Sequence, residues 1–301
     1  QKTLGGDTYS SDGSAFTAAN NVAIGYQAMT VATTGSSNVA IGANALDELL
    51  TGSNNVAIGT NAMHSADGGE GSHVAIGANA LALLDGASYS MTAVGYDALK
   101  NLTTAPFTVG VGYKAGEDVT TAESFTGVGY GVGMKISTGN NNTGLGTEAL
   151  ASNSAAALTG YGNTAVGRRS GYVLQGGAQE NTFVGAQSGV ALTIGRFNTG
   201  IGVDALNSET VGDYATAIGY RALWKQNSDS NNENTYNTGV GAGAGYYNVT
   251  GQYNTWLGVD AGSGASGQSN SKNTGVGAVS LEEVTTGSSN VAMGFSAARA
   301  L

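Results

Sequence analysis

The nine residues Asn55–Met63, NVAIGTNAM, are one copy of a motif that occurs sixteen times, and Asn21–Met29, NVAIGYQAM, is another. The glycines of successive copies are 17 to 22 residues apart. A short period sustained over nearly the whole chain is typical of a repeat protein rather than a globular domain. We number each copy from its glycine, the pivot, so that Ile58 is position −1 of Gly59. The pivots are Gly25, Gly42, Gly59, Gly77, Gly95, Gly112, Gly129, Gly146, Gly167, Gly185, Gly202, Gly219, Gly241, Gly258, Gly277 and Gly294.

The residues before each pivot have the pattern of a short β-strand. Position −1 is apolar in all sixteen copies, and position −3 is always Val or Thr. Residues two apart lie on one face of a strand, so this β-branched face is predicted to be buried. Position −2, on the opposite face, is Ala or Gly except at Phe183 and Trp256. Such small residues indicate close approach of another backbone, from a neighbouring chain or from a second wall of the same coil.

Polar and glycine positions predict the corners of each coil. The pivot is expected to have a positive φ, and Asn at −4 is expected to stack into a side-chain ladder. A second glycine lies seven residues before eight of the pivots, after Thr-rich stretches such as Val31–Gly35. This pattern predicts two short strands per coil and therefore two sheets. The ladder residues are Asn21, Asn38, Asn55, Asn142, Asn163, Asn181, Asn198, Asn237, Asn254, Asn273 and Asn290.

Together these patterns predict an all-β fold, a single-stranded parallel β-solenoid, or β-roll, of about 16 coils of 17–22 residues. Residues 1–20 carry no copy of the motif and are expected to be an irregular lead-in or cap, while residues 21–301 form one continuous repeat domain.

Composition narrows the classes of function. The formal net charge is −10, and no basic cluster is denser than Arg168-Arg169, which argues against nucleic acid and anionic membranes as partners. Cysteine is absent, so no disulfide and no thiolate metal site is expected. No apolar run approaches the roughly 20 residues that cross a bilayer, so membrane insertion is not expected.

Few residues suit catalysis or metal binding. His64 and His73 are the two histidines, and we interpret His73, at −4, as a polar replacement for Asn. Acids at position +2 are separated by several coils, and Glu282-Glu283 is one local pair. We therefore expect no enzyme activity, no cofactor and no metal, with a polysaccharide-acting solenoid as a remote alternative. The acids at +2 are Asp97, Glu148, Asp204 and Asp260, and the weak candidates for a hard cation are Asp7 and Asp12 near Gly13, and Asp229 with Glu233.

Exposed aromatic residues are the candidates for recognition. Aromatic rings beside polar amides suit glycan binding, and they also suit protein interfaces such as the seam of a trimer. Both interpretations stay open. The candidate residues are Tyr26, Tyr96, Tyr113, Tyr130, Phe183, Tyr220, Trp224 and Trp256. Ice binding through ten Thr residues at −3 is a further alternative, disfavoured because −3 is expected to face the interior.

The repeats resemble two groups of proteins. Segments such as Asn163–Gly167, NTAVG, and Asn198–Gly202, NTGIG, are similar to the coils of trimeric autotransporter adhesin heads and of phage tail-fibre-like adhesins. The resemblance covers over nine-tenths of the chain, although autotransporter heads usually have shorter coils. It implies a left-handed β-roll, a homotrimer, and an extracellular, cell-surface or virion location.

The function implied by this resemblance is attachment to a host or surface. The partners would be further copies of the chain and a cell-surface glycan or protein receptor. A subunit that stacks end to end into an extracellular filament is the alternative, suggested by a last copy that ends at Leu301 without a capping sequence.

Overall fold

The computed structural model describes residues 20–66, 71–85, 89–152, 156–231, 233–266 and 269–299. The predicted lead-in at 1–20 lies outside these ranges apart from Asn20, as do Asp7, Asp12 and Gly13. The chain divides into two compact units, 1–142 and 143–301, which are described separately below. Within the described ranges every regular element is a β-strand.

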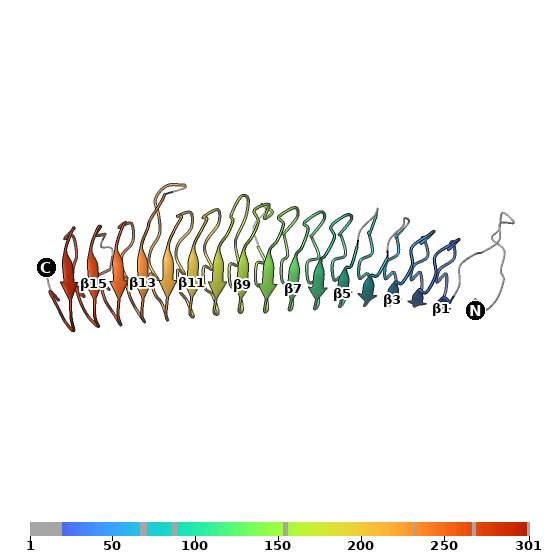
Figure 1. Cartoon of the computed structure of the whole chain (residues 1–301), viewed down its shortest axis with the longest axis horizontal. Helices are drawn as coiled ribbons and strands as arrows, with labels where there is room; N and C mark the ends of the chain where they lie inside the picture. Colours follow the sequence, from blue (N-terminus) through green and yellow to red (C-terminus); the bar gives the residue numbers. More distant parts are fainter. Residues whose placement is uncertain are drawn as a thin grey trace. The chain divides into compact units, whose positions relative to one another are not determined.

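Each coil contributes one three-residue strand that occupies positions −3 to −1 (Figure 1). The strands of unit 1 are β1 (Val22–Ile24), β2 (Val39–Ile41), β3 (Val56–Ile58), β4 (Val74–Ile76), β5 (Thr92–Val94), β6 (Val109–Val111) and β7 (Thr126–Val128). Those of unit 2 are β8 (Thr143–Leu145), β9 (Thr164–Val166), β10 (Thr182–Val184), β11 (Thr199–Ile201), β12 (Thr216–Ile218), β13 (Thr238–Val240), β14 (Thr255–Leu257), β15 (Thr274–Val276) and β16 (Val291–Met293).

Within each unit, consecutive strands pair in parallel and in register. Val39 lies opposite Val22 and Val56 in unit 1, and Thr199 lies opposite Thr182 and Thr216 in unit 2. The chain therefore advances by one strand per winding, which confirms the predicted all-β parallel solenoid.

The pivot glycines stack directly on one another. All sixteen have φ between +120° and +141°. At Gly202, with φ +129°, a Cβ atom would lie 2.4 Å from the carbonyl oxygen of Gly219 in the next coil. A side chain is excluded there by both the backbone conformation and the space.

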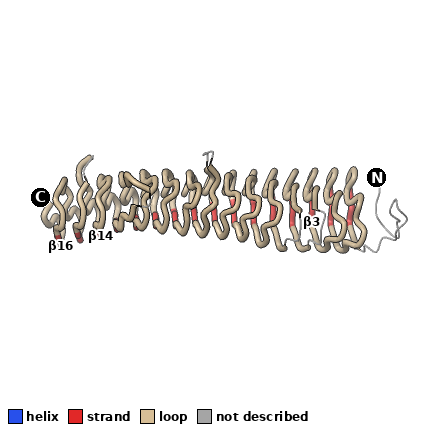
Figure 2. The backbone as a smooth tube through the Cα atoms, turned by 90° about the horizontal axis from the view of Figure 1, so that it is seen from above, coloured by secondary structure: helices blue, strands red, loops and turns tan. Residues whose placement is uncertain are grey.

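Three further left-handed residues turn each coil, at positions −5, +2 and +4. In the coil of Gly202 these are Phe197, Asp204 and Leu206, with φ of 59°, 58° and 52°. Left-handed backbone is rare for residues with side chains and cannot continue a strand. Most of each winding is therefore corner and turn, as Figure 2 shows by the short strand segments on each coil.

The prediction of two sheets is wrong. The Thr-rich stretch before the second glycine forms no strand in the described residues, and its coils meet through a few hydrogen bonds such as that from the backbone N–H of Thr193 to the carbonyl of Thr210 (2.7 Å). Isolated bridges, such as Leu158 with Gly176, are the remaining trace of a second ladder. The left-handed residue at −5 follows this stretch by a few positions and prevents it from extending into a regular strand.

The predicted orientation of the strand faces is also wrong. Position −2 points inward and is buried in every strand, whereas −3 and −1 are half-buried or exposed. The interior is too thin for a β-branched side chain at −2, because the backbone at +3 of the same coil and the residue at +4 of the preceding coil approach it. A Cβ on Gly239 would already lie 3.0 Å from the carbonyl oxygen of Ala244 in its own coil and 3.0 Å from Cγ of Leu223 in the preceding one. The small residues therefore accommodate the second wall of the same coil.

Large and small residues exchange places in this core. Phe183 and Trp256 are fully buried at −2, and in their coils position +4 is Gly189 and Gly262. A Cβ on Gly262 would lie 2.2 Å from the ring of Trp256, and one on Gly189 would lie 2.5 Å from that of Phe183. In these two coils a large residue at −2 is thus matched by a glycine at +4, and because both rings are fully buried, the predicted recognition role of these two aromatic residues is contradicted.

Substitution of one stacked pivot tests this architecture. Gly202→Ala should lower the free energy of unfolding by about 3 kcal/mol or more, because it adds both steric overlap and backbone strain. Urea denaturation followed by circular dichroism measures the change. Gly177→Ala is the matched control: its Cβ would meet nothing within 4 Å, so its effect should stay within about 0.5 kcal/mol. Equal midpoints for the two variants would contradict the stacking constraint.

Candidate functional site

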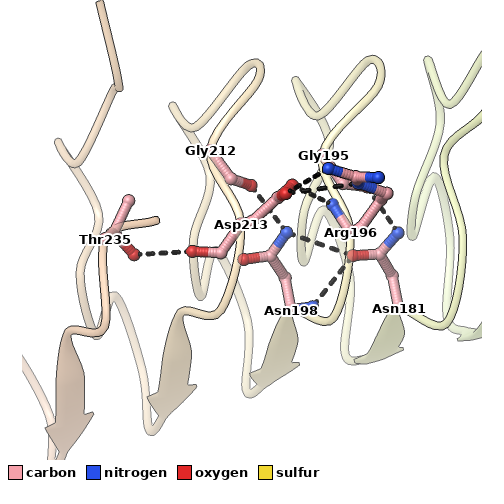
Figure 3. A network of polar contacts seen from close by, with 7 residues as sticks. All are labelled: Asn181, Gly195, Arg196, Asn198, Gly212, Asp213 and Thr235. Carbon is pink, nitrogen blue, oxygen red and sulfur yellow. Dashed lines mark hydrogen bonds and ion pairs between the residues drawn. The ribbon is translucent and has the colours of Figure 1, made fainter. Parts of the chain in front are cut away.

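The Asn residues at −4 form a hydrogen-bonded ladder along the inside of the coils. The side-chain oxygen of Asn181 accepts from the backbone N–H of Asn198 (3.0 Å), and the amide of Asn198 donates to the carbonyl of Gly212 (2.8 Å), as Figure 3 shows. Each Asn thereby satisfies backbone N–H and C=O groups of neighbouring coils that lie outside the strands and have no partner in the sheet. All eleven lie at this position, and nine are fully buried, with Asn21 and Asn290 half-buried.

His73 continues the ladder in unit 1. Its backbone N–H donates to the side-chain oxygen of Asn55 (3.0 Å), and its Nδ1 accepts from the backbone N–H of Met91 (3.2 Å). It therefore occupies the structural place of an Asn. His64 instead contacts the carboxylate of Asp47.

Three of the four acids at +2, Asp97, Glu148 and Asp204, are engaged with cations or amides. Asp97 lies 3.7 Å from the ammonium of Lys100 and accepts from the amide of Asn79. Glu148 pairs with Arg169 at 2.6 Å. In each of these contacts the partner is a basic or amide group rather than a second carboxylate.

The remaining acidic candidates form local contacts. Glu282 and Glu283 both contact Arg299, at 2.6 and 3.5 Å. Asp229 donates its backbone N–H to Glu233 (3.2 Å). No group of three or more potential metal-ligating side chains occurs in the described part of the chain.

A buried carboxylate interrupts the aliphatic core of unit 2. Position +7 is a buried aliphatic residue in most coils, including Leu174 and Leu192, but the next three coils have Glu209, Gln226 and Asn248. These three polar residues are also buried. The pattern around the pivots did not predict these buried polar residues. The signal available in the sequence was the break in the aliphatic row at +7.

Six donors satisfy the Glu209 carboxylate. Oε1 accepts from the backbone N–H groups of residues 210, 211, 212 and 228, at 2.8 to 3.2 Å. Oε2 accepts from the amide of Gln226 and the hydroxyl of Ser228, both at 3.1 Å. Three consecutive N–H groups that point at one oxygen form a nest for negative charge.

An ion pair lies beside this nest. Arg196 donates to the carboxylate of Asp213 from its backbone N–H (2.6 Å) and from its guanidinium (2.9 Å). The carbonyl of Asp213 in turn accepts from the hydroxyl of Thr235 (3.1 Å), as Figure 3 shows. Glu209 and Asp213 therefore fix both ends of the 226–235 insertion, which begins at Gln226 and ends at Thr235.

Aromatic residues of successive coils stack on one another. Tyr96, Tyr113 and Tyr130 form one row in unit 1, with ring centroids 5.5 and 5.3 Å apart. A second row in unit 2, which the sequence analysis missed, consists of Phe197, Tyr214, Tyr236 and Tyr253, with centroids 4.9 to 5.3 Å apart. All four occupy position −5, and this shared offset was the available signal. Because the ring faces inside a row are covered by neighbours, such rows expose mainly ring edges.

The other aromatic candidates differ in their surroundings. Tyr26 is 74% exposed. Tyr220 and Trp224 belong to a compact cluster in unit 2, the cationic aromatic cluster. It consists of Tyr220, Arg221, Trp224, Lys225, Tyr246 and Tyr247.

Two cations contact the Trp224 ring of this cluster. The Lys225 ammonium lies 3.9 Å from the ring centroid and the Arg221 guanidinium carbon 5.2 Å from it. Burial acts to lower the pKa of Arg221, but its hydrogen bond to Asp204 and the neighbouring Tyr220 outweigh that effect, so the pKa is raised and the group stays charged.

Comparisons with known proteins add no assignment: no protein-family model and no curated protein matches the chain. Among the described residues, no helix has the length and apolar character needed to span a membrane.

The Glu209 nest can be tested by removing the carboxylate. Glu209→Ala should destabilise the protein by roughly 3–5 kcal/mol, because several buried N–H groups lose their acceptor. Glu209→Gln should cost less, since one side-chain oxygen remains to accept. Urea denaturation measures both, with the exposed Glu123→Ala as a control that should change stability by less than about 0.5 kcal/mol. A Glu209→Ala protein as stable as this control would contradict the role of the nest.

Proposed function

We propose that the chain is a non-enzymatic structural and adhesive segment of an extracellular or virion-borne fibre, and that it assembles as a homotrimer through the outward face of its sheet. The observation that carries the proposal is the character of that face. Positions −3 and −1 of all sixteen strands are Val, Thr, Ile, Leu or Met, without a single charge.

This face is half-buried or exposed in the single chain. Ile24 is 50% exposed, Leu257 47% and Met293 76%. Contiguous apolar surface of this kind on a folded protein marks a contact with a partner. The aliphatic row at −1 repeats at strand spacing, so a second copy with the same repeat offers a matching surface along each unit.

The small residues at −2 face the interior of the coil, so they cannot form a contact between subunits. Positions −3 and −1, on the other side of the strand, are the ones that support trimerisation. The rest of the coil surface carries ion pairs such as Glu148 with Arg169 and Asp204 with Arg221, which favour solvent. Along the described strands the sheet face carries no charge, and this contrast with the ion-paired parts of the coil favours it as the interface.

A second candidate function, ice binding, gains from the outward orientation of position −3. In unit 2 the strands β8 to β15 all begin with Thr, which places eight threonines in register on one outward face. Hydroxyl and methyl groups repeating at roughly 4.8 Å offer a regular array for ordered water. The sheet face cannot bind ice and another subunit at the same time. Measured thermal hysteresis together with a monomeric state would therefore favour ice binding over the trimer.

Charge placed on the sheet face tests the main proposal. The unchanged protein should sediment as a trimer in analytical ultracentrifugation. The double variant Ile201→Lys/Ile218→Lys should weaken assembly at least about a hundredfold, because each subunit would bring two unpaired charges into the contact. Val203→Lys is the matched control: Val203 is 46% exposed in the same coil but lies at +1, outside the strand, so assembly should persist.

The outcomes separate the alternatives. A folded, monomeric wild-type protein at micromolar concentration would overturn the trimer. Concentration-dependent fibres in electron micrographs would instead favour the end-to-end filament.

A further inference from the structure

The cationic aromatic cluster lies at the base of the longest insertion in unit 2. Trp224 and Lys225 immediately precede Gln226, where the 226–235 insertion begins, and the loop between β12 and β13 projects beyond its neighbours in Figure 1. Trp224 packs against Tyr246 of the next coil with ring centroids 4.9 Å apart. Tyr246 meets Tyr247 edge to face at 4.5 Å. The cluster therefore spans two coils beside this insertion.

The backbone next to the cluster is fixed by hydrogen bonds to residues of the preceding coil. Gln226 and Ser228, just after Lys225, are both bound to the buried Glu209 carboxylate. At the other end of the insertion, Thr235 donates to the carbonyl of Asp213. A surface whose backbone is fixed in this way loses little conformational entropy when it binds a ligand.

The charge on Lys225 is not neutralised by a neighbour. No carboxylate of the described residues lies within ion-pair distance of its ammonium, which instead faces the Trp224 ring at 3.9 Å. Lys114 gives the contrast in unit 1: it lies 5.9 Å from the Tyr113 ring, but its ammonium is paired with Glu117 at 3.1 Å. In a chain with a net charge of −10, Lys225 is therefore a local positive site.

We propose that the cationic aromatic cluster binds a glycan that carries carboxylate groups, such as a uronic acid polymer. Lys225 and Arg221 would pair with the sugar carboxylates. Tyr220, which is 52% exposed, would contact the apolar C–H groups of a sugar ring. Exposed polar residues of the insertion, such as Ser230 and Asn231, would accept or donate hydrogen bonds to sugar hydroxyls.

The surrounding charges favour a glycan over nucleic acid. Arg221 already forms an ion pair with Asp204, whose carboxylate lies 3.3 Å from its Nε. Two further carboxylates, those of Asp229 and Glu233, lie in the insertion itself. Nucleic acid binding uses an extended stripe of basic residues, whereas the cluster offers two cations, which can pair with one or two carboxylates of a bound glycan. The inference rests on the proposed adhesive function, and it names the chemical class of the surface that the fibre would recognise.

Titration of the full chain with hexagalacturonate, using cellohexaose as the uncharged match, tests the inference. In isothermal titration calorimetry, hexagalacturonate should bind at least tenfold more tightly than cellohexaose. The preference should shrink as salt rises, because exposed charge pairs are screened. Lys225→Ala should weaken hexagalacturonate binding about tenfold and Trp224→Ala further, whereas Lys225→Arg should retain most of it.

Lys100→Ala and Tyr113→Ala are the matched controls and should leave binding unchanged, since both residues lie in unit 1. Circular dichroism establishes that each variant is folded. No binding of hexagalacturonate, equal binding of cellohexaose, or a Lys225→Ala variant that binds like the wild type would each overturn the inference. Sedimentation of the same samples distinguishes the trimer proposal from the ligand proposal. A protein that is a trimer but does not bind hexagalacturonate would contradict only the ligand proposal.

Discussion

The close stacking of the pivot glycines is the constraint on which the rest of each unit depends. A glycine carbonyl occupies the space where the Cβ of the previous pivot would be, so successive windings meet at backbone distance at this corner. With this corner fixed, the strand before it is three residues long and pairs in register with the next. The left-handed residues at −5, +2 and +4 then close the winding within 17 residues. A solenoid of this kind is specified by backbone geometry as much as by burial.

The thin interior follows from these tight corners. Since so little space remains, the inward strand position must be small wherever Leu or Met occupies +4, and it becomes aromatic only where +4 is Gly. Trp256 with Gly262 and Phe183 with Gly189 show the same exchange. The β-branched residues at −3 and −1 are left outside as a consequence. The apolar surface of the sheet is thus produced by the geometry of the core.

Sequence reasoning recovered the winding but not its orientation. Period, strand position and corner glycines were predictable because each is a local property repeated sixteen times. The assignment of the faces failed because it assumed that the more hydrophobic face of a strand is the buried one. That assumption holds for a thick core, whereas here Ala217 is buried and Ile218 beside it is 36% exposed. The small residues at −2 carried the correct information, since a backbone did approach them, but it belonged to the same chain.

Features that occur once were the hardest to predict. Glu209 occupies a core position, and its six hydrogen-bond donors come from residues up to 19 positions away. No local sequence pattern therefore predicts this arrangement. The cationic aromatic cluster likewise joins Trp224 to Tyr246 across two coils. The repeat itself explains why such features are tolerated: in a solenoid each coil contacts only its neighbours, so a polar core residue or a long loop perturbs one or two windings. Unit 2 therefore keeps one uniform sheet face while a single coil acquires a distinct chemistry. A uniform surface suits contact with further copies of the chain, and a distinct one suits a ligand, which is why the two proposed activities fall on different parts of the same coils.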